Sequence, residues 1–376
     1  MLNKKRVNTG DIIIGRPLSH DVYDAEGVLL LQRGQILESQ KQIDTLLARG
    51  LYFIFNVLPA RIQSTKAEKL HDATPFGLID DIYFQLSTLC KSQNTKVNFP
   101  SRVIDLCKRL QQACQKDADA ALGAIFLSKE RKYSIMHQIH CALVLEIFLK
   151  HLGRSSAERL PLLAAGLTMN ITMIGLQDVL FNQKGVLTEG QRVEVKNHPH
   201  RGVELLRSYG VADEAWLTTV LQHHEFIDGS GYSQGLRGDD ICQTARMLML
   251  ADIYCAKLFP RAYRVPLHPD RAAREMFTGS RGHCFDMDLS KLFIKELGLF
   301  HPGSFVRLSN GEIAVVIRRG EKIHHPIVCS VVKADGSPYL APRQRDCSKD
   351  EFAITDSVAP KDITININKR QLWGYD

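Results

Sequence analysis

Apolar residues recur at the spacing of helix turns through the middle of the chain. Two such stripes lie ahead of residue 131, and a longer apolar run, Tyr133–Leu152, predicts a strong amphipathic helix. Stripes of this kind form a hydrophobic core or a face for a partner helix, so we assign them no chemistry. The two stripes consist of Phe76, Leu78, Ile79, Ile82, Tyr83 and Leu86, and of Val103, Ile104, Leu106, Cys107 and Leu110.

The helical pattern continues to about residue 299. Pro161–Gly175 and Thr188–His198 predict two helices, with a turn over Asp178–Lys184 between them. Leu217–Gln222 predicts the end of another helix. Arg246–Asp252 belongs to one more, whose interior is apolar and whose last residue is an aspartate.

Both ends of the chain have a β-type pattern. Asp11–Leu18 and Val28–Leu31 predict short strands, followed by a helix over Ser39–Arg49 that Gly50 closes. Near the other end, strands on either side of Asn310-Gly311 predict a hairpin. Pro326–Val332 predicts a third strand there, and a further strand is expected near residues 352–354. The expected fold is therefore mainly α, with small β-rich N-terminal and C-terminal units.

Composition narrows the class of protein. The chain has 376 residues and a net charge of +7 without a long basic run, so a nucleic-acid partner is not expected. No apolar run reaches 18 residues, so we expect no membrane span. Nine scattered cysteines without a Cys-x-x-Cys pair favour reduced thiols, and we therefore expect a cytoplasmic protein.

Two adjacent histidines, His223 and His224, end a predicted helix and precede a Gly-rich loop that contains Gly231 and Tyr232. Imidazoles are suitable ligands for Zn, Mn, Fe or Ni. Asp252 is a carboxylate in an otherwise apolar helix, where a charged group needs a partner. A histidine pair alone is weak evidence, and the longer pattern around it decides the interpretation.

That pattern resembles the HD-GYP family, bacterial metal-dependent phosphodiesterases that hydrolyse cyclic di-GMP. The similarity extends from about Lys132 to Phe277, and it predicts an HD-domain-like helical bundle. The matching segments are Leu187-Thr188, Lys196-Asn197-His198-Pro199 with Gly202, His223-His224-Glu225, Asp228-Gly229-Ser230-Gly231-Tyr232, Gly235-Leu236-Arg237-Gly238, Ala251-Asp252 and Arg261-Ala262-Tyr263-Arg264.

The same register shows departures from the family at its name-giving motif. Met169 stands where the family has His, Asn170 where it has the metal-bridging Asp, and Met173 where it has Lys. Ser233 stands where Pro is expected, and Cys255 replaces an acidic residue. The resemblance therefore identifies a degenerate member that lacks the His-Asp pair and has no intact catalytic set.

The resemblance also implies which residues remain at the site. By position, the implied metal ligands are His137, His198, His223, His224 and Asp252. The implied ligand-binding residues are Gly231, Tyr232, Arg261, Tyr263 and Arg264. His140 and His200 lie outside the motifs: we expect His140 to be solvated or hydrogen-bonded and His200 to be exposed.

The altered motif limits what the site can do. An asparagine is neutral and offers one carbonyl oxygen, so Asn170 would not offset the repulsion between two divalent cations. A thioether such as that of Met169 is a poor ligand for hard or borderline ions. Three imidazoles can hold one ion with an open position, so the sequence permits one divalent metal (Fe, Mn, Zn or Ni). The alternative is a polar cluster that holds no metal.

These observations lead to one expected function and one alternative. We expect a non-catalytic cyclic di-GMP signalling protein, which binds the dinucleotide or a partner such as a GGDEF-type diguanylate cyclase. The alternative is an active metal-dependent phosphodiesterase that produces pGpG or GMP. The expected organisation is a β-rich segment at 1–60, a helical linking region at 61–131, the degenerate HD-GYP domain at 132–299 and a β-rich extension at 300–376.

Overall fold

The computed structural model describes residues 3–6, 22–23, 29–31, 35, 37, 39, 52–55, 74–91, 97–127, 131–258, 271, 275, 284–363, 365 and 367–375. The chain divides into two compact units, Met1–Leu70 and His71–Asp376. None of the helices within the described residues combines the length and the apolar composition that crossing a membrane requires.

The first unit contains a four-stranded antiparallel sheet. Its strands are β1 (Asn3–Arg6), β2 (Val22–Tyr23), β3 (Leu29–Leu31) and β4 (Tyr52–Phe55), in the order β1-β4-β2-β3. β3 confirms the strand predicted over Val28–Leu31. The strand predicted over Asp11–Leu18 lies outside the described residues, and so does the helix predicted over Ser39–Arg49, apart from Ser39.

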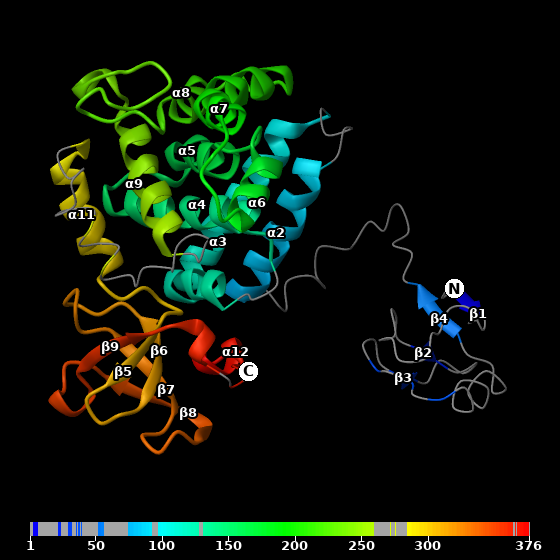
Figure 1. The fold of residues 1–376 in the computed structure, drawn as a ribbon, viewed down its shortest axis with the longest axis vertical. Coiled ribbons are helices and arrows are strands. Elements are labelled where there is room, and N and C mark those ends of the chain that lie inside the picture. The colour runs from blue at the N-terminus through cyan, green and yellow to red at the C-terminus, as the bar shows by residue number, and fades with distance from the viewer. Residues whose placement is uncertain are drawn as a thin grey trace. The chain divides into compact units, whose positions relative to one another are not determined.

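The second unit begins with a helical bundle (Figure 1), and the mainly α fold is confirmed. Its helices are α2 (Pro75–Lys91), α3 (Phe99–Phe126), α4 (Tyr133–His151), α5 (Ser156–Thr168), α6 (Ile174–Asn182), α7 (Glu189–Ser208), α8 (Glu214–Gln222), α9 (Gln243–Leu258) and α11 (Met287–Leu297). A short helix, α12 (Lys369–Trp373), closes the chain.

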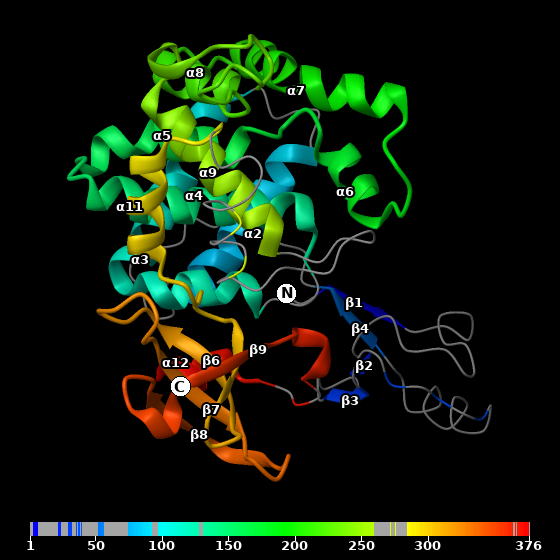
Figure 2. The ribbon, with the colours of Figure 1, turned by 60° about the vertical axis from the view of Figure 1, so that its left-hand side comes forward.

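Helix α4 lies in the centre of this bundle, as Figures 1 and 2 show, and packs against α2, α3, α5, α6, α9 and α11. Every residue from Tyr133 to Leu149 is buried. The prediction of an amphipathic helix is therefore wrong, because neighbours cover α4 on all sides and it has no solvent face. The polar side chains on α4 consequently need protein partners.

The segment around the altered motif differs from its prediction in two ways. The helix predicted over Pro161–Gly175 is interrupted, because α5 ends at Thr168 and a turn precedes α6. The turn predicted over Asp178–Lys184 is mostly the second half of α6. The predicted helix after Thr188 begins with a capping box between Thr188 and Gln191 and continues past His198 to Ser208.

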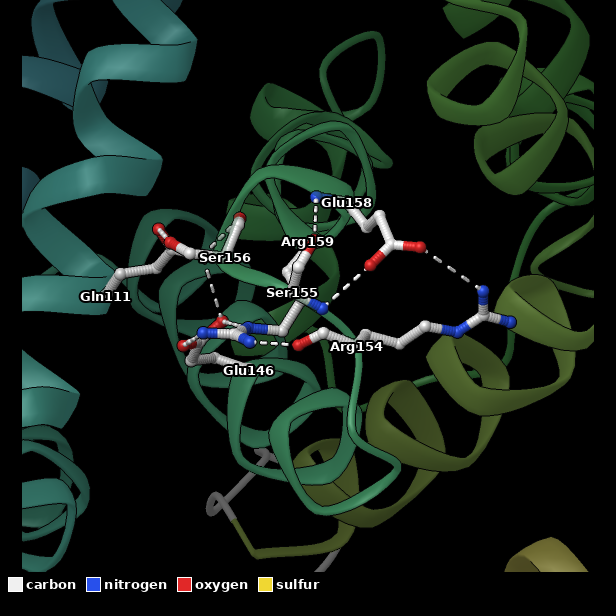
Figure 3. A network of polar contacts seen from close by, with 7 residues as sticks. All are labelled: Gln111, Glu146, Arg154, Ser155, Ser156, Glu158 and Arg159. Atoms are coloured by element: carbon white, nitrogen blue, oxygen red, sulfur yellow. Dashed lines mark hydrogen bonds and ion pairs between the residues drawn. The ribbon is translucent and has the colours of Figure 1, made fainter.

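A buried polar network ties α4 to the start of α5 (Figure 3). The Arg159 guanidinium donates to both oxygens of Glu146, with the Nε–Oε2 pair 2.9 Å apart and the Nη2–Oε1 pair 3.0 Å apart. Gln111 of α3 donates from Nε2 to the Ser156 carbonyl at 3.0 Å and to Glu146 Oε2 at 3.4 Å. Bidentate pairing and the additional donor satisfy a carboxylate that would otherwise be costly to bury.

The chain then forms a five-stranded antiparallel sheet, seen in yellow to red in Figure 1. Its strands are β5 (Phe305–Leu308), β6 (Ile313–Arg318), β7 (Ile327–Val332), β8 (Pro338–Asp346) and β9 (Ile354–Val358), in the order β8-β7-β6-β5-β9. The predicted hairpin is confirmed, and Gly311 supplies its turn with a φ of 85°. β8 was not expected from the sequence because it lies at the sheet edge and most of its side chains are exposed.

A buried histidine pair joins the helical bundle to this sheet. His140 of α4 and His301, just before β5, have their Nε2 atoms 3.0 Å apart. The Nδ1 atom of His301 donates to the Pro302 carbonyl at 2.7 Å, so His301 Nε2 accepts the hydrogen bond from His140. His140 is thus hydrogen-bonded and buried, and His200 is exposed, as expected.

This pair predicts a stability that falls with acidification. Burial lowers the pKa of both imidazoles, and that of His301 falls to about 3. The charge of Arg319 also lowers the pKa of His301. The charge of His137, when that residue is protonated, lowers the pKa of His140. Between about pH 6.5 and about pH 3 the unfolded chain therefore binds more protons than the folded chain, and the free energy of unfolding decreases as the pH falls.

We expect His301→Gln to remove part of this pH dependence. Between about pH 6.5 and about pH 5, one such imidazole contributes a loss of about 2 kcal/mol in the free energy of unfolding. Urea unfolding at several pH values should therefore give a shallower profile for His301→Gln than for the wild type. His200→Gln tests whether the replacement of any histidine has this effect. Parallel profiles for the wild type and His301→Gln would contradict the prediction.

Candidate metal centre and ligand pocket

The structure brings together the five residues expected as metal ligands. His137 lies on α4, His198 on α7 and Asp252 on α9, while His223 and His224 follow the last residue of α8. Four of them, His137, His198, His224 and Asp252, line a pocket with a volume of about 610 Å³, and His223 contacts His198 beside it. The elements that contribute them are spread over more than a hundred positions of sequence, so the convergence depends on the tertiary fold.

The orientation of His198 follows from the proline after it. Pro199 lies inside α7 and has no backbone N–H, so the Val195 carbonyl one turn earlier lacks its usual helical donor. The Nδ1 atom of His198 donates to this carbonyl oxygen at 2.7 Å. The hydrogen bond fixes the proton on Nδ1 and leaves Nε2 with a free lone pair.

His223 has the same arrangement at the end of α8. Its Nδ1 atom donates at 2.6 Å to the Val220 carbonyl, one of the last four carbonyls of the helix, which an α-helix cannot satisfy by itself. The Nε2 atoms of His198 and His223 then face each other at 3.2 Å. Each of the two imidazoles is neutral and carries its proton on Nδ1. Their Nε2 lone pairs therefore face each other, and this arrangement suits a bound cation.

The charge state of these imidazoles fits that arrangement. Burial and the nearby His223 lower the pKa of His198 to about 3. Burial also lowers the pKa of His223, although Asp252 partly opposes this. The pKa of His224 is lowered by burial and by His223 as well. All three are therefore neutral at physiological pH, the form that binds a metal.

His224 completes a group of three imidazoles. Possible ligand atoms of His198, His223 and His224 lie within 4.8 Å of one another. The ring of His224 stacks on that of Tyr232, with centroids 4.6 Å apart and an interplanar angle of 27°. The resemblance implied Tyr232 as a ligand-binding residue. Its ring contacts His224, and Tyr232 also lines the pocket.

Gly231 permits this stacking. A Cβ atom at Gly231 would lie 2.4 Å from the backbone nitrogen of Phe226 and 2.5 Å from the carbonyl oxygen of His224. The backbone of the loop therefore packs directly on the backbone that follows His224, and Tyr232 N donates to His224 O at 3.1 Å. The buried carboxylate of Glu225 accepts hydrogen bonds from the backbone nitrogens of Gln234 and Leu236 and closes the loop.

The second group lies beside the three imidazoles. His137 Nε2 is 2.6 Å from Asp252 Oδ1, and the second oxygen, Oδ2, is 3.9 Å from His224 Nδ1. Burial opposes the charged form of His137, but the hydrogen bond to Asp252 and the charge of its carboxylate raise the pKa of His137 to about 10. Burial would raise the pKa of Asp252. The hydrogen bond from His137 and the charge of that imidazole instead hold the pKa of Asp252 well below its usual range.

The residues of the altered motif lie in different environments. Asn170 and Met173 line the pocket. Met169 is fully buried and belongs to the hydrophobic core. Thr172, in the turn between them, donates from Oγ1 to the His198 carbonyl at 3.1 Å, which connects this turn to α7.

Two pocket residues were not identified from the sequence. Lys184 and Arg192 line the pocket and are exposed. Arg192 Nη1 lies 3.6 Å from Glu189 Oε2. They lie outside the motif positions, and lone surface cations give no signal in a sequence. Arg261, Tyr263 and Arg264, expected as ligand-binding residues, lie outside the described residues.

A protein-family comparison matches residues 122–289 to the model described as "HD domain". The match covers α4 to α9 and therefore every residue of the two groups described above. The pocket and the three imidazoles belong to this matched region.

Curated relatives support the same relationship. A cyclic di-GMP phosphodiesterase of Pseudomonas aeruginosa is 30% identical over 220 residues, 57% of this chain and 51% of the relative. A cyclic di-GMP phosphodiesterase response regulator of Xanthomonas campestris pv. campestris is 33% identical over 138 residues, 36% of each chain. The chain thus spans about half the length of the first relative and about a third of the second.

A solved structure shows the shared fold. An HDG"Y"P protein of Bdellovibrio bacteriovorus matches with a TM-score of 0.50 and 13% sequence identity. The similarity covers 77% of this chain and 98% of that chain. It therefore extends beyond the region matched as an HD domain.

We expect Gly231→Ala to disturb the pocket loop. The added methyl group overlaps the backbone near Phe226, and overpacking of this kind costs about 1–3 kcal/mol in the free energy of unfolding. Urea unfolding should show this loss. Gly185→Ala is the control, because a Cβ there meets nothing within 4 Å and should change the free energy by less than about 0.5 kcal/mol. Equal stability of the two variants would contradict the role assigned to Gly231.

Proposed function

We propose that this chain acts in cyclic di-GMP signalling as a non-catalytic member of the HD domain family, whose model matches residues 122–289. In this proposal the pocket binds cyclic di-GMP and a divalent cation, and the dinucleotide is not hydrolysed. The proposal rests on two features of the pocket taken together. The group of three imidazoles suits one cation, and the neutral side chains of Asn170 and Met173 line the pocket beside it.

The donor set fits one divalent cation. His198, His223 and His224 are neutral, and two of them are oriented by backbone carbonyls, as metal-binding histidines commonly are. Three imidazoles suit Fe, Mn, Zn or Ni and leave a position open for a phosphate oxygen. When bound, the cation would supply positive charge to a phosphodiester. The chain supplies the orientation of the imidazoles and the walls of the pocket.

At two described positions beside the imidazoles, neutral side chains stand where hydrolysis would need charge. Attack on a phosphodiester needs an activated water and cations that neutralise the developing charge. Asn170 is neutral where an anion would hold a second cation, and Met173 brings no ammonium to the phosphate. Removal of a single electrostatic donor costs about 10²- to 10³-fold in rate, so two such losses reduce hydrolysis by several powers of ten.

Binding makes smaller demands, and other pocket residues meet them. Lys184 and Arg192 present cations to phosphate groups, and Arg can do so with two hydrogen bonds. Tyr232 lines the pocket, and the ring that it stacks on His224 also offers a flat apolar surface to a base. A volume of about 610 Å³ lies within the usual range of ligand pockets. By resemblance, Gly231, Arg261, Tyr263 and Arg264 would contribute to the same ligand site.

A second candidate function is hydrolysis of cyclic di-GMP. The retained group of three imidazoles and the adjacent Asp252 carboxylate favour it, because Asp252 is an anion that faces both groups of ligands. This candidate differs from the first in its product and not in its ligand. A turnover assay therefore distinguishes the two.

We expect the full chain to bind cyclic di-GMP in the presence of Mn²⁺. Arg192→Ala should weaken the affinity about tenfold, because the loss of a charge-assisted contact corresponds to about 1.4 kcal/mol. Arg207→Ala is the matched control: it lies on the same helix but pairs with Glu214 outside the pocket, and it should bind as the wild type does. Calorimetry measures both affinities. Absence of binding by the wild type, or equal weakening by the two variants, would contradict the proposed site.

We expect no cyclic di-GMP hydrolysis above background with Mn²⁺, Fe²⁺, Mg²⁺ or Ni²⁺. The physical reason is the absence of charge at Asn170 and Met173. Chromatography of the reaction, with pGpG and GMP as standards, measures the products. Turnover by the wild type that His223→Ala abolishes would overturn the non-catalytic proposal and make the phosphodiesterase the function of this chain.

A further inference from the structure

Helix α6 buries one residue, and that residue is polar. Most side chains of Ile174–Asn182 are apolar, yet only Gln177 is buried, with 7% of its surface exposed. Its backbone nitrogen donates to the Met173 carbonyl at 2.7 Å and is satisfied. Its carboxamide oxygen, Oε1, is buried and has no hydrogen-bond partner among the described residues. A buried polar atom in this state is destabilising until a donor reaches it.

Gln177 also lines the pocket of about 610 Å³. Of the buried side-chain atoms that lack a partner in the described part of the chain, only Gln177 Oε1 belongs to a residue of this pocket wall. Leu180 and Phe181 follow Gln177 by three and four positions, so the three side chains share one face of α6. Leu180 and Phe181 line the pocket and are half-buried. This face of α6 therefore presents one carboxamide beside two apolar side chains.

Contacts with the start of α4 fix the rotation of α6. The Asp178 carboxylate accepts a hydrogen bond from the Ser134 backbone nitrogen at 3.4 Å. The ring of Phe181 stacks on that of Tyr133, with centroids 4.8 Å apart and an interplanar angle of 21°. Tyr133 in turn stacks on His137, with centroids 5.2 Å apart. The ring of Tyr133 therefore connects this face of α6 to the candidate metal centre.

We propose that Gln177 reads the Watson–Crick edge of one guanine base of cyclic di-GMP, while the face of the base lies against Leu180 and Phe181. The inference rests on the proposed function, because it assigns a base subsite within the pocket that would bind the dinucleotide. Proteins that take up unstacked bases supply an apolar surface for the face of the base and polar groups for its edge. Gln177 lies outside the motif positions that the resemblance supplied.

The chemistry of the carboxamide matches a guanine edge. A carboxamide carries one acceptor and one donor group side by side, and guanine offers the complementary pair, its N1–H donor beside its O6 acceptor. Rotation about the last torsion of the Gln177 side chain, whose energy wells are broad, brings either polar atom towards the base. A base bound in this way supplies the donor that the buried oxygen lacks.

A glutamate at the same position would read the base differently. A carboxylate carries acceptors only, so it would accept from two adjacent donors of guanine, N1–H and N2–H₂. Hypoxanthine is guanine without the 2-amino group. It keeps the N1–H and O6 pair that a carboxamide uses and lacks one of the two donors that a carboxylate uses. Cyclic di-IMP, which carries hypoxanthine, therefore distinguishes the two modes of recognition.

Calorimetry of the full chain with Mn²⁺ and each of the two dinucleotides tests the inference. Gln177→Leu removes both polar groups, so it should weaken the affinity for cyclic di-GMP and for cyclic di-IMP about tenfold each. Gln177→Glu should raise the ratio of the two affinities about tenfold over the wild type, in favour of cyclic di-GMP. The added negative charge repels both dinucleotides equally, so the ratio removes that effect.

Gln183 provides the matched control. It also lines the pocket, but its carboxamide is already paired: Oε1 accepts from Gln191 Nε2 at 2.8 Å, and Nε2 donates to the Val186 carbonyl at 3.0 Å. Gln183→Glu introduces the same charge into the same pocket wall without an edge to read. It should therefore leave the ratio of the two affinities as it is in the wild type.

Urea unfolding without a ligand separates base recognition from a structural role. An apolar side chain in place of an unpartnered carboxamide should leave the free energy of unfolding of Gln177→Leu unchanged or higher. A less stable Gln177→Leu that binds as the wild type does, or an unchanged ratio in Gln177→Glu, would overturn the inference alone. Absence of binding of both dinucleotides to the wild type would contradict the proposed function and, with it, this subsite.

Discussion

The complete burial of α4 is the constraint on which the rest of the second unit depends. A helix without a solvent face must be covered on every side, and its polar side chains must find partners in the protein. Glu146 finds Arg159 of α5, His140 finds His301 ahead of the sheet, and His137 finds Asp252 of α9. Each of these three residues of α4 thus contacts a different neighbouring element, and the candidate metal centre is one of these contacts.

Local sequence patterns predicted the parts of the site that depend on local geometry. The end of α8 at Gln222 and the proline after His198 place a carbonyl within reach of each imidazole, and both features can be read directly from the sequence. Periodicity also predicted the mainly α fold and the hairpin at Asn310-Gly311. The resemblance, rather than the pattern, indicated that His137, His198 and Asp252 belong with the histidine pair.

Other features could not be predicted because they arise from tertiary packing. The polar residues of α4 are distributed around the helix and do not form one face, a pattern typical of a helix that neighbours cover on all sides. Lys184 reaches the pocket from the turn between α6 and α7, whose path no periodic pattern determines, and Arg192 reaches it from the start of α7.

The charge of the three imidazoles bears on the proposed function. Neutral imidazoles would leave a bound cation its charge, and the pocket would offer that charge to an anionic ligand together with Lys184 and Arg192. A chain that keeps the three imidazoles can still bind a phosphodiester, because binding requires positive charge and an open position.

Hydrolysis makes a further demand, because negative charge develops on the phosphate and nearby groups must stabilise it. Asn170 and Met173 occupy the part of the pocket wall where such groups would act. Under the proposed function, neutral side chains at Asn170 and Met173 would therefore affect the transition state more than the bound ligand, and affinity for a phosphodiester would persist without hydrolysis.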